Sequence, residues 1–289
     1  MNSAKAFAPG NISCIFVIRR AKSPEKSGSL GVGFTVNKGV TVTIKKAHDK
    51  KHNKKIIIKN KNRNIIYFNN KKINFPTVDS TIEKLTDEKI IVDIKSGLPL
   101  GSGFGLSGAS ALATAYALNR LLKLKKAKKE LAMVAHIAEV ENLTGLGDVI
   151  NQYYGGVLVK YRPSYMFKAE KLPIKNKEVY YRYFSRLDTK KIISDGKIKK
   201  RINKAGLKAL GKIKKMGKKA DLENLIAISK DFAVESGLLK NRRIKGMIGN
   251  IERKKGNASM IMLGNAVFSD KKFKGIKKLI IKDRGACVL

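Results

Sequence analysis

A glycine-rich segment ahead of an expected helix carries the strongest chemical signal in the sequence. It reads Pro-Leu-Gly-Ser-Gly-Phe-Gly-Leu-Ser-Gly-Ala, from Pro99 to Ala109. Glycines let a backbone turn several N–H groups towards one anion, and a helix start adds unpaired donors and a positive dipole end. A packing turn between a strand and a helix would also use glycines. Four glycines among residues 101–108, beside a hydroxyl, favour a phosphate site.

Two common phosphate loops lack required residues in this segment. The spacing Gly103-x-Gly105-x-x-Gly108 fits the dinucleotide fingerprint, but the region about 20 residues later, where an acid should end a second strand, reads as helix and lysine. A Walker loop ends in Gly-Lys-Ser/Thr, whereas Ala109 and Ser110 follow Gly108. The segment therefore predicts a phosphate loop of another kind.

Three acids follow within ten residues of one another, at Glu139, Glu141 and Asp148, with Gly-Leu-Gly before the last. Phosphoryl transfer uses a carboxylate to orient the attacking hydroxyl and oxygen ligands to hold Mg²⁺. Residues two apart on a helix face different sides, so at most one glutamate enters a site. We favour Glu139 and expect Glu141 to pair with a lysine. A turn-forming or helix-capping role is the alternative for Asp148.

The glycine segment resembles the phosphate loop of the GHMP kinase superfamily, Pro-x-x-x-Gly-Leu-Gly-Ser-Ser-Ala. Leu106 and Gly108 depart from that pattern, and Phe104 takes its apolar position. The Gly-x-Gly-Phe-Gly-x-Ser-Gly-Ala form looks like that of the archaeal pantoate kinases. The residues in register with the superfamily are Pro99, Gly103, Gly105 and Ser107.

This resemblance implies a role for each residue. Ser107 and Glu139 would hold Mg²⁺, and Asp148, which begins an Asp-x6-Gly-Gly stretch similar to that of several GHMP kinases, would position the acceptor hydroxyl and take its proton. The residues expected to bind the phosphates of ATP are Pro99, Gly101, Gly103, Gly105, Ser107, Gly108 and Ala109.

Two N-terminal segments resemble substrate-binding parts of these kinases. Residues 6–13 are similar to the first superfamily motif, Ala-Pro-Gly-Lys, with Asn11 in place of the lysine, and residues 27–33 resemble a pantoate kinase stretch. Asn11, Ser29 and Lys160 are therefore the candidate substrate-binding residues, although Ser29 could lie in a plain turn and Lys160 on a solvated surface. A third motif, at residues 256–265, is expected to pack beneath the site.

Hydrophobic periodicity predicts the elements that position these residues. Strands are expected at 41–44, 56–59, 65–68, 89–94, 156–161, 179–184, 260–263 and 279–282, and a loop at 22–33. Helices are expected from about 109 to 121, and at 128–142, 199–216, 222–240 and 242–254.

The composition of the chain indicates its cellular compartment and the classes of partner that it binds. The chain has 62 basic and 22 acidic residues, a net charge of +40, but its lysines are spread along the whole length without an arginine-rich tail or interleaved aromatics. We interpret them as a solvated surface rather than a dedicated nucleic-acid site. The two cysteines, with no signal peptide and no apolar run of about 20 residues, favour a cytoplasmic protein with no membrane segment.

The resemblance implies an α+β fold in two lobes: a β-α-β lobe like that of a ribosomal protein at residues 1–165, and a ferredoxin-like lobe at 166–289. The implied reaction is Mg²⁺-dependent phosphorylation of the 4-hydroxyl of pantoate by ATP, giving 4-phosphopantoate for archaeal coenzyme A synthesis. A homodimer is compatible with this interpretation. The alternatives are a GHMP kinase of the homoserine, shikimate or mevalonate type, or a basic non-catalytic nucleic-acid-binding protein.

Overall fold

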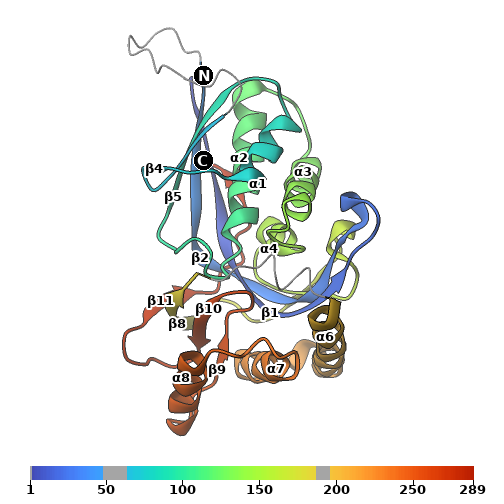
Figure 1. The fold of residues 1–289 in the computed structure, drawn as a ribbon, viewed down its shortest axis with the longest axis vertical. Coiled ribbons are helices and arrows are strands. Elements are labelled where there is room, and N and C mark those ends of the chain that lie inside the picture. Colours follow the sequence, from blue (N-terminus) through green and yellow to red (C-terminus); the bar gives the residue numbers. More distant parts are fainter. Residues whose placement is uncertain (1, 48–63, 187–195) are drawn as a thin grey trace.

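The computed structural model describes residues 2–47, 64–186 and 196–289, which form two β-sheets with helices packed on them (Figure 1). The expected strand at 56–59 lies outside the described residues. In the larger sheet the strand order is β12-β1-β2-β5-β3-β4, and β6 and β7 continue from β2. Its strands are β1 (Ala4–Arg19), β2 (Gly28–Lys46), β3 (Ile65–Phe68), β4 (Lys71–Lys72), β5 (Ile90–Ser96), β6 (Val157–Lys160), β7 (Glu170–Leu172) and β12 (Cys287–Val288).

Strands β1 and β2 form a long antiparallel hairpin that runs from the helices of the larger sheet to those of the smaller one (Figure 1). The register shifts twice along β1, between Pro9 and Asn11 and between Ser13 and Ile15. Such bulges bend a strand and re-aim its side chains. The two shifts bracket Asn11 and Ser13, whose side chains both donate hydrogen bonds to Asp148.

Four helices cover one face of the larger sheet: α1 (Pro76–Glu83), α2 (Leu106–Leu122), α3 (Lys128–Glu141) and α4 (Asp148–Tyr154). Helix α2 packs directly on β1 and β2, and α3 packs on α2. Alanine has the highest helix propensity, and its small side chain lets α2 approach the sheet closely. The parallel strands β3 and β5 are joined through α1, so this part of the sheet contains a β-α-β connection.

The smaller sheet has the strand order β11-β8-β10-β9, with all neighbours antiparallel. Helices α6 (Gly196–Met216), α7 (Leu222–Glu235) and α8 (Arg242–Arg253) lie between β8 and β9 in the chain. Asp221 and Asn241 cap α7 and α8 by accepting hydrogen bonds from backbone N–H groups. The strands are β8 (Glu178–Ser185), β9 (Ala258–Met260), β10 (Asn265–Ser269) and β11 (Lys277–Ile280).

Buried side chains join the two sheets. Phe16 of β1 packs edge-on against Phe232 of α7, with ring centroids 5.5 Å apart. Cys14 of β1 is fully buried beside α7, where the Ser229 hydroxyl donates to its carbonyl oxygen at 3.0 Å. No helix among the described residues is long and apolar enough to cross a membrane. The lobe boundary at residue 165 stays a prediction. Strands β7 and β12 follow that residue in the chain and belong to the larger sheet.

The structure differs from three of the predicted elements. The loop expected at 22–33 is confirmed at 22–27 and is wrong from Gly28, where β2 begins. The glycines of β2 serve close packing, and a Cβ on Gly31 would lie 2.1 Å from the Ile15 carbonyl oxygen. Helix α7 ends at Glu235 instead of residue 240, and β9 ends at Met260, where the predicted strand 260–263 begins. Helix α4 was not predicted.

Candidate active site

The glycine segment forms a tight loop between β5 and α2. Gly101, Gly103 and Gly105 have φ values of +75°, +87° and +61°, which side chains rarely adopt. The N–H groups at the start of α2 have no partner within the helix, as at any helix start. The Ala109 amide is already used, because it donates to the Gly105 carbonyl at 3.0 Å. The amides of residues 106–108 are therefore the donors that this loop offers to an anion.

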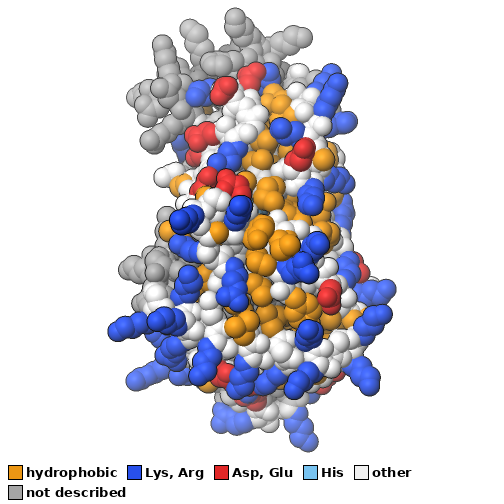
Figure 2. All heavy atoms as spheres, turned by 90° about the vertical axis from the view of Figure 1, so that its right-hand side faces the viewer, with side chains coloured by type: hydrophobic (Ala, Val, Ile, Leu, Met, Phe, Trp, Pro, Cys, Tyr) orange, Lys and Arg blue, Asp and Glu red, His pale blue; other side chains and the backbone are white. Residues whose placement is uncertain are grey.

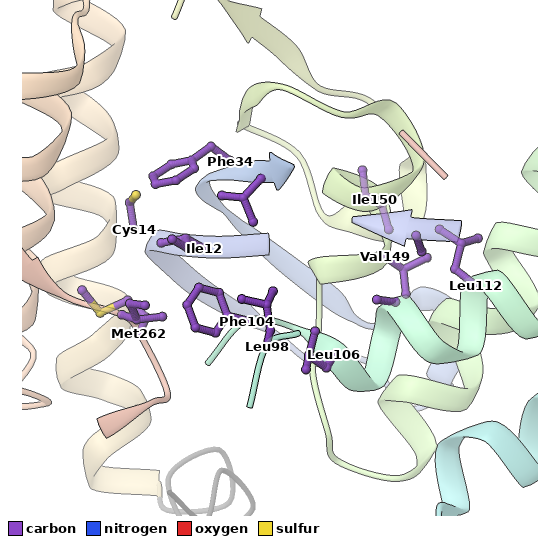
Figure 3. Close-up of a cluster of buried hydrophobic side chains, with 14 of the residues drawn as sticks. Ile12, Cys14, Phe34, Leu98, Phe104, Leu106, Leu112, Val149, Ile150 and Met262 are labelled. Carbon is purple, nitrogen blue, oxygen red and sulfur yellow. The ribbon is translucent and has the colours of Figure 1, made fainter. Parts of the chain in front are cut away.

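Buried contacts hold the loop from behind. Phe104 packs edge-on against Tyr181 of β8, with ring centroids 4.9 Å apart, and the backbone N–H of Asn11 donates to the Phe104 carbonyl at 2.9 Å. Figure 3 shows the hydrophobic cluster beneath, which includes Phe104 and Leu106 of this segment and Val149 of α4. Since both sheets anchor the loop, its backbone donors are fixed before an anion arrives.

Asp148 lies directly against the glycine loop. A Cβ on Gly105 would be 2.8 Å from its carboxyl carbon, and both residues line one cavity together with Ser107. Its Oδ1 accepts hydrogen bonds from Asn11 Nδ2 at 2.6 Å and from Ser13 Oγ at 3.1 Å. Burial raises the pKa of Asp148, while Lys160 and the two donors to Oδ1 oppose the rise. The carboxylate therefore has one oxygen held by the protein and the other beside the cavity.

Glu139 is fully buried behind the same loop. No donor among the described residues meets either carboxyl oxygen at full hydrogen-bond geometry, although the Val149 backbone N–H lies close enough to lower the pKa of Glu139. Gln152 Oε1 also has no donor among the described residues. A Cβ on Gly108 would lie 2.9 Å from Glu139 Oε1 and 3.1 Å from Gln152 Oε1, so these oxygens gather beside the loop. Burial, followed by the charge of Asp148, raises the pKa of Glu139 well above its ordinary value. Glu141 is exposed and pairs with Lys84 at 2.8 Å.

A second cavity begins on the other side of Asp148 and holds two of the predicted substrate residues, Ser29 and Lys160. Lys160 is buried, and its ammonium group donates to the Gly147 carbonyl at 2.8 Å and to Asn151 Oδ1 at 2.9 Å. Burial lowers the pKa of Lys160 to about 8, against the opposing charges of Asp148 and Glu139. The apolar side chains that line this cavity are Ile15, Phe16, Leu30, Val32, Leu146 and Leu263.

Asn11 differs from the expectation of a substrate contact. Its side chain is fully buried between Asp148 and Asn151, and it lines neither cavity. Its position behind Asp148 indicates a supporting role. The motif at residues 256–265 packs against the loop as expected, because a Cβ on Gly264 would lie 2.1 Å from the Ser102 carbonyl oxygen.

Sequence reasoning missed several residues of the site. Ser13 contacts Asp148, Gln152 donates to the Gly105 carbonyl at 2.8 Å, and Asn151 contacts Lys160. Arg186 reaches the loop from the end of β8: a Cβ on Gly101 would lie 2.8 Å from its Nε. The three-residue and four-residue steps from Asp148 to Asn151 and Gln152 were the available signal, since they predict one face of a helix.

His136 supports the site without facing it. It is fully buried, and its Nε2 lies 3.0 Å from the Ser27 carbonyl oxygen, two residues before Ser29. Burial lowers its pKa to about 4, so the ring is neutral near pH 7 and Nε2 carries the proton that is donated. The position of His136 therefore indicates a structural role.

Comparisons with known proteins place this geometry among kinases. Residues 74–156 match the family model described as the GHMP kinases N-terminal domain. The chain is 36% identical to the pantoate kinase of Methanocaldococcus jannaschii, over 91% of this chain and 90% of that protein. It is 30% identical to the pantoate kinase of Thermococcus kodakarensis, over 92% and 86% of the two chains.

A solved structure agrees with the sequence relatives. The protein described as a phosphotransferase related to the CoA biosynthesis pathway superposes with a TM-score of 0.83 at 26% identity, and the match covers 99% of this chain and 98% of the other. The likeness therefore extends over both sheets and is not limited to the glycine loop.

Proposed function

The chain belongs to the pantoate kinases, within the GHMP kinase superfamily, and from this premise we propose how its residues divide the reaction. The reaction is transfer of the γ-phosphoryl group of ATP to the 4-hydroxyl of pantoate, on the route to coenzyme A. One observation gives this assignment of roles its strongest support. Asp148 lies against Gly105 of the phosphate loop, between the two cavities. A hydroxyl in one cavity and a phosphoryl group in the other would meet beside its carboxylate.

The chemistry of the second cavity suits pantoate. An ammonium group has three donors, and Lys160 uses two on protein oxygens, so one remains for the substrate carboxylate. The Ser29 hydroxyl lies on the same wall, and Ile15, Phe16 and Val32 supply an apolar wall for the branched dimethyl carbon. The cationic amine of homoserine would instead meet the buried charge of Lys160, which disfavours that acceptor.

The loop amides and Arg186 would bind the polyphosphate. Backbone donors at the start of α2 face the cavity that Gly103, Gly105 and Ser107 line. Arg186 adds a cation from the second sheet above Gly101. A cavity of about 390 Å³ adjoins the other end of the loop at Pro99, with Asn69 and Tyr183 on its walls, and it is our candidate for the nucleoside.

The residues behind the loop fit a magnesium ion. Mg²⁺ prefers oxygen ligands and usually keeps substrate phosphates and waters in its shell, so it needs few protein ligands. Glu139 offers a buried carboxylate beside the loop, and Ser107 offers a hydroxyl at the loop. When bound, the ion would neutralise the charge of the phosphates, and it would favour the ionised form of Glu139.

Asp148 would orient the 4-hydroxyl and accept its proton. Oδ1 is held by Asn11 and Ser13, which leaves Oδ2 for the substrate. The raised pKa of Asp148 suits a base that works near neutral pH, because a carboxylate of ordinary pKa is a weaker proton acceptor. The bond from the acceptor oxygen to the γ-phosphorus forms as the bond to the β-phosphate oxygen breaks.

An acceptor panel tests the proposed function. Release of ADP is measured with pantoate, homoserine, shikimate and mevalonate at equal concentrations, and pantoate is expected to be turned over far faster than the others. Rapid turnover of another alcohol would replace the acceptor while retaining the kinase. Salt-dependent RNA binding without any ADP release would favour the nucleic-acid-binding alternative.

The substitution Asp148→Asn tests the catalytic residue. It keeps the Oδ1 acceptor for Asn11 and Ser13 but removes the base, so we expect kcat to fall by about 10²–10⁴-fold while ATP affinity stays within about twofold. Single-turnover kinetics and equilibrium nucleotide binding measure the two quantities. Near-normal kcat in this variant would contradict the role given to Asp148.

Two further proposals concern the setting. We propose that the enzyme works in the cytoplasm, which is supported by two unpaired cysteines among the described residues. A homodimer remains a prediction, and sedimentation velocity at two protein concentrations would test it.

A further inference from the structure

Two buried amides link Lys160 and Asp148, which both line the second cavity, in one hydrogen-bond chain of four side chains. Lys160 Nζ donates to Asn151 Oδ1 at 2.9 Å, and Asn151 Nδ2 donates to Asn11 Oδ1 at 2.9 Å. Asn11 Nδ2 then donates to Asp148 Oδ1 at 2.6 Å. Both amides are buried, with 1% of Asn151 and 0% of Asn11 exposed to solvent. Water therefore has little access to replace a lost partner.

The two ends of this chain fix its direction. A lysine ammonium group can only donate hydrogen bonds, and an ionised carboxylate can only accept them. Each amide must therefore point its oxygen towards Lys160 and its NH₂ group towards Asp148. Turning either amide by 180° would bring two donors or two acceptors face to face in a buried site, which costs about 1–3 kcal/mol for each unsatisfied group.

The surrounding backbone leaves room for this chain. Gly33 of β2 lies beside both amides: a Cβ there would be 2.5 Å from Asn151 Nδ2 and 3.3 Å from Asn11 Oδ1. Asn151 lies three residues after Asp148 on α4, so the two side chains share one helix face. Strands β1 and β6 deliver Asn11 and Lys160 to that face.

We propose that Asn151 is a positioning residue for phosphoryl transfer, which acts by holding the Asn11 amide with its NH₂ group towards Asp148. Asn151 lines neither cavity, so it would touch neither substrate. Its effect would reach the reaction through Asp148, whose Oδ1 is engaged by Asn11 and whose Oδ2 is thereby left for the acceptor hydroxyl. This inference rests on the proposed kinase function.

The substitution Asn151→Asp reverses the chain while it keeps the shape of the side chain. The new carboxylate would still accept from Lys160, but it has no donor for Asn11. The Asn11 amide would then turn its NH₂ group to this carboxylate and its oxygen to Asp148, which displaces the catalytic carboxylate. We expect kcat to fall by about 100-fold, as for a misplacement of about 1 Å, while KM for ATP stays within about twofold.

The substitution Asn151→Leu separates this role from simple packing. Leucine is further from asparagine in chemistry, but it removes the chain without reversing Asn11, so we expect a fall in kcat of only about tenfold. A residue that merely supports the fold would give the opposite order, with leucine more harmful than aspartate. Asn119→Asp is the matched control, because Asn119 clamps the Lys126 backbone at the far end of α2 and should leave kcat unchanged.

A measurement independent of turnover completes the test. The side-chain NH₂ resonance of Asn11, assigned from its loss in Asn11→Ser, should shift in Asn151→Asp and stay in place in Asn119→Asp. If the wild-type chain phosphorylates none of the four alcohols, the proposed function fails while this resonance still reports on the hydrogen-bond chain. If Asn151→Asp keeps kcat within twofold of wild type in a folded protein, the positioning role of Asn151 is overturned.

Discussion

Lys160 is the residue whose charge state should control acceptor binding. Its burial lowers the pKa to about 8, so the ammonium form that we pair with the pantoate carboxylate is lost as the pH rises through this value. Below pH 8 the cation is present and the carboxylate is bound. Above it a neutral amine faces the substrate. The affinity for pantoate is therefore expected to fall as the pH rises.

We predict that kcat/KM for pantoate falls above about pH 8, approaching tenfold per pH unit, because this ratio reports the pKa values of the free enzyme. Initial rates between pH 6.5 and 10 measure it. In Lys160→Arg the cation cannot be lost in this range, so the alkaline fall should disappear even if the absolute rate is lower. A wild-type profile that stays flat to pH 9.5 would contradict the role of Lys160.

At the scale of elements, the start of α2 and the start of α4 must meet without a side chain between them. Gly105 occupies that position with φ +61°, and a Cβ there would press on the Asp148 carboxyl carbon at 2.8 Å. Gly105 thus meets two requirements, a left-handed turn ahead of α2 and close contact with the carboxylate that we propose to be catalytic.

We predict that Gly105→Ala lowers kcat about 100-fold because Asp148 is displaced, and that it costs about 1–2 kcal/mol of unfolding free energy because of its left-handed φ. Steady-state kinetics and urea unfolding measure the two effects. Gly246→Ala is the control: this helical glycine of α8 has open space around it, so it should gain about 1 kcal/mol of stability with unchanged kcat. Equal kcat in both variants would refute the contact.

The sequence allowed prediction of elements wherever periodicity extends over many residues. Helices α2 and α3 and strands β3 and β6 lie close to their expected positions. Helix α4 has only seven residues, too few to show a hydrophobic period, and it was missed together with Asn151. The glycines of β2 were interpreted as a loop because the sequence does not show that they face the β1 backbone.

The residues of the site could likewise be predicted only where a local pattern in the sequence marks them. The contact between Asp148 and the glycine loop could be inferred from the resemblance, and the structure has it. The link from Lys160 through Asn151 could not, because it depends on the pairing of β6 with β2, which places Lys160 opposite Gly31. Spacing along a chain gives no information on such a register.

At the scale of the whole molecule, the net charge of +40 is the dominant feature. Figure 2 shows lysine and arginine side chains spread over the described part of one face, around a strip of hydrophobic side chains. Eight ion pairs are found among the described residues, all between partly exposed side chains. Most of the positive charge is therefore balanced only by solvent ions, which screen it over about 10 Å at 0.1 M salt.

We predict that added salt stabilises this protein and slows its substrate capture. Screening reduces self-repulsion in the compact state, so Tm should rise between 0.05 and about 0.5 M NaCl. The same screening weakens attraction of anionic substrates, so kcat/KM for ATP should fall while kcat changes little. Differential scanning fluorimetry and initial rates measure both. A Tm that falls over this range would show that local ion pairs outweigh the net charge.

The rate at which the Cys14 thiol is alkylated should report how often the two sheets separate. Cys14 is buried where β1 meets α7, and this burial raises the pKa of its thiol. An alkylating reagent should therefore react with Cys14 only after α7 has moved away, whereas the partly exposed Cys287 should be labelled at once. A nucleotide bound by both the glycine loop and Arg186 would hold the two sheets together. It would therefore slow the labelling of Cys14 without changing the labelling of Cys287. Ligand binding could then be followed on this protein with no turnover at all.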